Sequence, residues 1–140
     1  MQLRSLMRAL ALVSASLISC SSVVHSVSPE DKPQAVLLIG ESDNGRTVDI
    51  RLGESVRINL PENATTGYRW TIDRYDQELI EALSTEASYP PNTIGVGGEV
   101  SFIFKGKKIG TGEIVLKHWR HWEGDSSVTT RFHISLRVRP

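Results

Sequence analysis

The stretch VDIRLGESVRINL, residues 48–60, decides the fold, because apolar and polar side chains alternate along it on both sides of a glycine. A period of two places the apolar side chains of a β-strand on one face and the polar side chains on the other. The pair Gly53-Glu54 interrupts the alternation and predicts a turn between two strands. Strands of this kind are typical of antiparallel sheets that pack face to face around a core.

The same alternation recurs through the rest of the chain. It is found around residues 68–73, 100–104, 114–116 and 131–139. A further strand is expected over 34–40, whereas 77–83 could form a helical turn or a short edge strand. Trp70 lies mid-strand on an apolar face, where a core tryptophan is expected. The pattern predicts an all-β protein, an immunoglobulin-like antiparallel β-sandwich of about seven to eight strands.

Three connections are predicted to meet at one end of this sandwich. Successive antiparallel strands place their connections alternately at the two ends of a sheet. Strands that begin near residues 48, 56, 68, 78, 100, 112 and 129 put three connections at the same end, those over 61–67, 84–98 and 119–127. This prediction requires the 77–83 segment to cross the sheet.

The N-terminus has the pattern of a targeting segment. Arg4 and Arg8 precede an apolar run over 9–18, which is too short to span a bilayer, since a spanning helix needs about 20 residues. The run ends in Leu-Ile-Ser-Cys at residues 17–20, which resembles the bacterial lipobox, whose cysteine carries the lipid and becomes the first mature residue. The alternative is an ordinary secretory signal with an incidental cysteine.

These features divide the chain into three parts. We expect a lipoprotein signal peptide over 1–19, a lipidated N-terminus on Cys20 with a flexible tether over 20–34, and the folded domain over 35–140. Ser21, rather than Asp, follows the cysteine, which by resemblance favours delivery to the outer membrane. The expected location is therefore the bacterial cell envelope, with the domain facing the periplasm or the cell surface.

Composition narrows the functional classes. Lys and Arg number 16 and Asp and Glu number 16, so no overall charge directs the protein to nucleic acid. Cys20 is the only cysteine, which leaves the domain without a thiol nucleophile, a disulfide or a cysteine metal site. We expect a monomer that has neither a cofactor nor enzymatic activity.

The three predicted loops carry residues suited to binding. The first contains Asn63, Ala64, Thr65, Thr66, Gly67 and Tyr68. The second contains Ile94, Gly95, Val96, Gly97 and Gly98. The third contains Arg120, His121 and Trp122. Glycine allows a close backbone approach, and tryptophan and arginine often carry the binding energy of protein interfaces.

In their order and spacing these loops resemble the chagasin family of cysteine protease inhibitors. The family shows Asn-Pro-Thr-Thr-Gly followed by an aromatic residue, then Gly-x-Gly-Gly, then Arg-Pro-Trp. The resemblance implies an immunoglobulin-like fold and a papain-like cysteine protease as the partner. It also implies that Thr65 and Thr66 cover the catalytic cysteine of the protease, and that the second loop lies along the non-primed subsites with Ile94 directed to an apolar pocket. Arg120 and Trp122 would dock on the primed side.

Two positions depart from the family pattern. Ala64 and His121 stand where the family has proline. Because proline lowers the entropy that a loop loses on ordering, we expect weaker or more selective inhibition than in members that keep both prolines.

Two other interpretations remain open. The residues His118, His121, Glu123 and Asp125 lie close together in sequence and could form a metal or hydrolytic site, although 118 and 121 point to opposite faces of an extended strand. Alternatively, the same loops could belong to a non-inhibitory immunoglobulin-like binding module of the bacterial envelope, because this fold hosts many functions.

Overall fold

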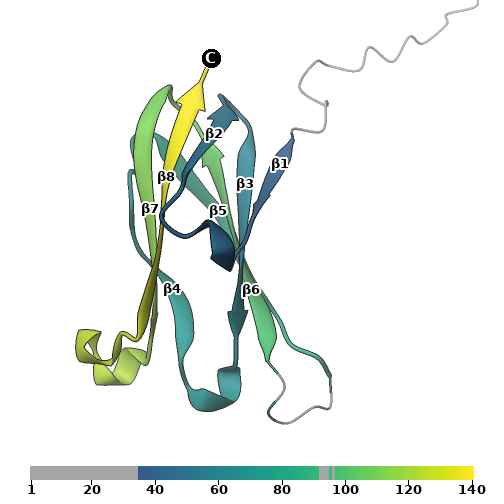
Figure 1. Ribbon diagram of the computed structural model, residues 1–140, viewed down its shortest axis with the longest axis vertical. Coiled ribbons are helices and arrows are strands. Elements are labelled where there is room, and N and C mark those ends of the chain that lie inside the picture. The colour runs from purple at the N-terminus through teal and green to yellow at the C-terminus, as the bar shows by residue number, and fades with distance from the viewer. Residues whose placement is uncertain (1–34, 92–94, 96) are drawn as a thin grey trace, which may run out of the picture. The chain divides into compact units, whose positions relative to one another are not determined.

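The computed structural model describes residues 35–91, 95 and 97–140 (Figure 1). Their regular structure is almost entirely β. The eight strands are β1 (Val36–Ile39), β2 (Thr47–Arg51), β3 (Ser55–Glu62), β4 (Arg69–Tyr75), β5 (Ile80–Ser88), β6 (Gly98–Gly106), β7 (Gly110–Trp119) and β8 (Thr130–Arg139). Short 3-10 turns are the other elements, namely η2 (Glu41–Asp43), η3 (Ala64–Thr66), η4 (His121–Glu123) and η5 (Asp125–Ser127). The all-β prediction is confirmed.

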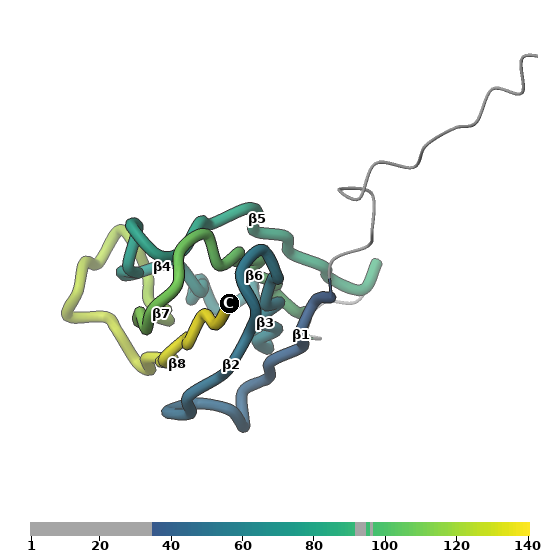
Figure 2. The backbone as a smooth tube through the Cα atoms, turned by 90° about the horizontal axis from the view of Figure 1, so that it is seen from above, coloured from purple at the N-terminus to yellow at the C-terminus, as the bar shows by residue number. Residues whose placement is uncertain are grey.

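The strands form two four-stranded sheets, which can be followed end-on in Figure 2. One sheet has the order β1-β3-β6-β5 and the other β2-β8-β7-β4. The other four strand pairs are antiparallel, as predicted, but β1 pairs with β3 and β2 pairs with β8 in parallel. The parallel pairing of β1 with β3 arises because the intervening strand β2 joins the other sheet. Since β1, β2 and β3 alternate in direction, β1 and β3 run the same way.

The core lies between the two sheets and follows the predicted alternation. Val56, Ile58 and Leu60 of β3 are fully buried, and Trp70 is only 8% exposed. Phe102, Phe104 and Phe132 supply the largest fully buried side chains. Burying one such side chain stabilises a fold by about 1.5–3 kcal/mol, so this layer is the main source of stability.

The uncertain segment over 77–83 is part turn and part strand. Leu79 lies in a turn, where its backbone N–H donates to the Asp76 carbonyl, and β5 begins at the next residue. The register of β5 shifts between Ala82 and Ser84, and Leu83 is 49% exposed, which blurs the alternation expected of a strand. Because β5 crosses the sheet, the strand count used to place the three loops holds.

Residues Pro33–Pro140 form one compact unit. All eight strands and the buried cluster fall within it, so this unit contains everything that a domain needs to fold on its own. Within the described residues, no helix has the length and apolar character required to cross a membrane. Cys20 and the predicted signal peptide and tether lie outside the described residues.

Candidate functional site

The three predicted loops lie at the same end of the sandwich, at the bottom of Figure 1. They connect β3 to β4, β5 to β6, and β7 to β8. Ile94 and Val96 are outside the described residues, whereas Gly95 and Gly97 are exposed and Gly98 begins β6. The structure therefore brings together segments that lie more than 50 residues apart in sequence, such as Thr66 and Arg120.

The first loop is held by hydrogen bonds within itself. Asn63 caps the turn η3, and its Oδ1 accepts from the backbone N–H of Thr65 at 3.1 Å and from the Thr65 hydroxyl at 2.6 Å. The Thr66 hydroxyl donates to the Asn63 carbonyl at 2.8 Å and accepts from the Tyr68 N–H at 3.3 Å. Both threonines are exposed, so they form the surface of the loop while their hydroxyl groups stiffen it.

Gly67 ends this turn in a conformation that favours glycine. Its φ is +80°, in the left-handed region. A Cβ atom placed there would lie 2.6 Å from Cη2 of Trp122. The indole of the third loop therefore rests directly on the glycine of the first, and any side chain at 67 would displace it.

The third loop is fastened to the first by Arg120. Its Nε and Nη2 donate to the Thr66 carbonyl oxygen at 3.1 and 2.9 Å, and its Nη1 donates to Glu123 at 3.2 Å. The guanidinium also stacks over the Tyr68 ring, 4.3 Å from its centroid. Arg120 thus positions both loops, and this leaves Trp122, which is 60% exposed, as the large apolar group facing solvent.

An aromatic column continues from the loops toward the core. Tyr68 stacks on His118 with ring centroids 5.4 Å apart, and His118 lies 5.0 Å from Trp70. Partial burial lowers the pKa of His118, because it penalises the charged imidazolium, although the Glu62 carboxylate acts in the opposite direction. A neutral His118 is therefore favoured in the folded state, where it supports the ring that Arg120 covers.

A buried carboxylate links the first loop to the start of the second. Glu62 is only 4% exposed, and its Oε2 accepts from the Trp70 N–H at 2.7 Å. Its Oε1 accepts a short hydrogen bond from the Tyr89 hydroxyl and lies 3.5 Å from Nη1 of Arg69. Burial, followed by the hydrogen bond to Glu62, raises the pKa of Tyr89. Because Tyr89 also packs against Gly98, this network joins both strands of the second loop to the first loop.

The sequence prediction did not assign roles to Glu62, Arg69 or Tyr89. One signal was available, because Glu62 continues the inward series of Val56, Ile58 and Leu60. A carboxylate in an inward position needs partners, since a buried charge is stable only when it is paired and hydrogen-bonded. Those partners come from other strands and could not be identified from local spacing.

The residues considered for a metal site are engaged separately. His118 stacks between aromatic rings, Glu123 pairs with Arg120, and Asp125 accepts from Lys117 at 2.9 Å, a bond that lowers the pKa of Asp125. His121 instead packs edge-on against the indole of Trp122. Among the described residues, no group of three or more His, Cys, Asp or Glu could hold a metal ion.

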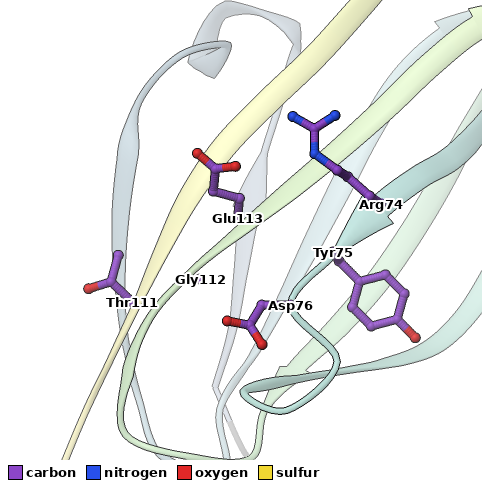
Figure 3. A pocket seen from close by; sticks show the side chains of 6 residues that line it. All are labelled: Arg74, Tyr75, Asp76, Thr111, Gly112 and Glu113. Carbon is purple, nitrogen blue, oxygen red and sulfur yellow. The ribbon is translucent and has the colours of Figure 1, made fainter.

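A shallow hollow lies away from the three loops, beside the start of β7 (Figure 3). Its lining residues are Arg74, Tyr75, Asp76, Thr111, Gly112 and Glu113. None of the sequence-predicted binding residues contributes to it. The candidate site is thus the end of the sandwich where the three loops lie, here called the loop edge.

Known proteins resemble this chain in sequence and in fold. Residues 49–136 match the family described as chagasin family peptidase inhibitor I42. Chagasin from Trypanosoma cruzi is 33% identical over 105 residues, which cover 71% of this chain and 96% of chagasin. Amoebiasin-1 from Entamoeba histolytica is 34% identical over 104 residues, again covering 71% and 96%. The crystal structure of the cysteine protease inhibitor EhICP2 from Entamoeba histolytica has the same fold, with a TM-score of 0.66 at 24% identity over 77% of this chain and 99% of that one.

Proposed function

This chain belongs to the chagasin family of peptidase inhibitors, and on that premise we propose that it inhibits papain-like cysteine proteases by filling their active-site cleft with its three loops. The observation that carries the proposal is the double hydrogen bond from Arg120 to the Thr66 carbonyl, which makes the first and third loops one rigid edge. A rigid edge loses little conformational entropy on binding, so more of its contact energy becomes affinity.

Each loop has a distinct role in this mechanism. Thr65 and Thr66, exposed on a stiff turn, enter the cleft and cover the catalytic cysteine without presenting a bond that can be cut. The glycines at 95, 97 and 98 let the second loop lie close to the non-primed wall of the cleft, with Ile94 entering an apolar pocket. On the primed side Trp122 provides an exposed aromatic surface, and Arg120 holds it in place.

Titration of papain with the 33–140 unit tests the proposal. We expect stoichiometric, reversible loss of papain activity and no effect on trypsin, a serine protease. The triple variant Thr65→Ala, Gly97→Glu, Trp122→Ala removes one contact from each loop. It should fold normally, because Thr65 and Trp122 are exposed and a Cβ at Gly97 meets no atom closer than 3.8 Å. Full papain activity in an excess of the folded unit would refute the proposal.

We further propose that the domain is anchored in the bacterial envelope through a lipid on Cys20. The support is the order of Arg4, Arg8, the apolar run over 9–18 and the cysteine at its end. Expression of the full chain in a bacterium with labelled palmitate should give a labelled product that partitions into detergent. Cys20→Ser should abolish the label, and a labelled Cys20→Ser product would contradict the proposal.

A further inference from the structure

The three loops are not carried by the same sheet. The second loop connects β5 to β6, which belong to one sheet, and the third loop connects β7 to β8, which belong to the other. The first loop passes from β3 in one sheet to β4 in the other, and in Figure 1 it lies between the third loop and the ends of β5 and β6. The position of the second loop relative to the third therefore depends on how each of them is joined to the first.

Arg120 joins the third loop to the first, and Tyr89 joins the second loop to the first. Tyr89 directly follows the last residue of β5, so it stands where the second loop begins. Its ring packs against Gly98, the first residue of β6, and leaves no room for a Cβ atom there. The tyrosine ring thus lies against both ends of the second loop.

The hydroxyl of Tyr89 is held from both strands that flank the first loop. Nη1 of Arg69 donates to this hydroxyl at 2.9 Å, and the hydroxyl donates a short hydrogen bond to Oε1 of Glu62. A guanidinium can only donate and a carboxylate can only accept, so the direction of both hydrogen bonds is fixed. Glu62 is the last residue of β3 and Arg69 is the first residue of β4.

The Glu62 carboxylate is itself anchored to the core. Its Oε2 accepts from the backbone N–H of Trp70 at 2.7 Å, and the indole N–H of Trp70 donates to the Pro61 carbonyl at 3.0 Å. Glu62 is 4% exposed and Trp70 is 8% exposed. An apolar side chain at this inward position would avoid the cost of burying a charge, so stability alone does not explain the carboxylate.

We propose that Glu62, Arg69 and Tyr89 form a positioning network that sets where the second loop lies relative to the first. The network thereby determines how well the loop edge fits the non-primed side of the protease cleft, an inference that rests on the proposed inhibitor function. The three residues act through the second loop and need not touch the protease. A loop held in this way loses less conformational freedom on binding.

Single substitutions in the 33–140 unit test this inference. Tyr89→Phe keeps the ring against Gly98 and removes only the hydroxyl, so the inhibition constant for papain should rise roughly tenfold, about the effect of losing one hydrogen bond to a charged group. Tyr75→Phe is the matched control, because it removes a hydroxyl at the other end of β4. Arg69→Gln should also weaken inhibition, whereas Arg74→Gln in the same strand should not.

Backgrounds that remove one loop contact show whether the Tyr89 hydroxyl acts through the second loop. Substitutions in one network couple, whereas independent substitutions add. Tyr89→Phe should still weaken inhibition roughly tenfold in a Trp122→Ala background, but by less than about threefold in an Ile94→Ala background. A general loss of folding stability would give the same factor in both. An equal factor in the two backgrounds, or wild-type inhibition by Tyr89→Phe, would overturn the inference.

A measurement without protease separates this inference from the inhibitor function. NMR order parameters of backbone amides report motion of the free unit. Tyr89→Phe should lower the order parameters of Gly95 and Gly97 relative to wild type and leave that of Thr65 unchanged. Unchanged values at both glycines would overturn the inference even if the unit inhibits papain. Lowered values in a unit that fails to inhibit papain would support the positioning network and refute the inhibitor function.

Discussion

Arg120 and Thr66 are 54 residues apart in sequence, yet one guanidinium donates two hydrogen bonds to one carbonyl oxygen. The acceptor is a backbone group of the first loop, and the donor is a side chain of the third. The contact therefore survives any change of side chain at residue 66, but it depends fully on the side chain at 120. The side chain of Arg120 in the third loop therefore fixes the position of the first loop.

Arg120→Lys should weaken protease inhibition while leaving the fold intact. A lysine ammonium is a compact charge and cannot reproduce the planar fork that reaches Thr66 and Glu123 together. We expect the free energy of binding to the protease to weaken by about 1.4 kcal/mol, which is roughly a tenfold rise in the inhibition constant. Arg131→Lys on the sheet surface is the control and should behave as wild type. An unchanged constant for Arg120→Lys would show that the two loops need no such link.

Gly67→Ala should reduce both stability and inhibition. The new Cβ combines a strained φ of +80° with a 2.6 Å approach to the Trp122 ring. Gly45→Ala separates the two effects, because Gly45 has φ +83° and a Cβ there would meet no atom within 4 Å. Thermal unfolding should show a loss of about 1 kcal/mol in both variants. Inhibition should weaken only in Gly67→Ala, and equal inhibition by the two would mean that the indole position is unimportant.

Ala64→Pro should tighten inhibition. Ala64 is the first residue of η3, and Asn63 before it is extended, with φ −110° and ψ 99°, as a residue before proline should be. The substitution lowers the conformational entropy of the loop before binding. This gain of about 0.4–1 kcal/mol would lower the inhibition constant roughly two- to fivefold. His121 occupies the equivalent place in η4, after the extended Arg120. His121→Pro should therefore act in the same direction, and weaker inhibition by Ala64→Pro would contradict this account.

Stability should fall in mild acid through His118. Its pKa is lowered in the folded state, so near the ordinary value of about 6.5 the unfolded chain binds more protons than the folded one. The stabilisation is present above that pH and is lost as the pH falls through the lower, folded pKa. The free energy of unfolding, measured with denaturant, should fall less between about pH 7 and pH 5 in His118→Phe than in the wild type. Phenylalanine keeps a ring in the stack but cannot titrate. Identical slopes for the two proteins would exclude His118 as the source.

Much of the fold could be predicted because burial on one face forces a period of two on the sequence. Val56, Ile58 and Leu60 read directly as an inward row, and all three are fully buried. The parallel pairing of β1 with β3 could not be predicted in this way. β1 is apolar along its whole length and only Ile39 in it is buried, so a period of two gives no information about which strand it pairs with.

For the candidate site, the sequence predicted several of the residues but not the contacts among them. Gly67, Arg120 and Trp122 stood out because glycine allows special backbone conformations and a close approach, and because tryptophan and arginine often carry the binding energy of protein interfaces. The contacts among them could not be read from spacing, and neither could the bond between Glu62 and Tyr89, which are 27 residues apart. Such pairs arise only when separate strands are brought into register, so they belong to the tertiary structure rather than to any local motif.

The unequal exposure of the tryptophans gives this protein an intrinsic optical reporter. Of its three tryptophans, Trp70 is sealed in the core, Trp119 is partly covered by the Lys117 ammonium, and Trp122 alone is largely open to water. Water-exposed indole emits at longer wavelengths than buried indole, so burial of Trp122 would shift its fluorescence toward the blue. Occupancy of the loop edge can thus be followed in solution without attaching a dye.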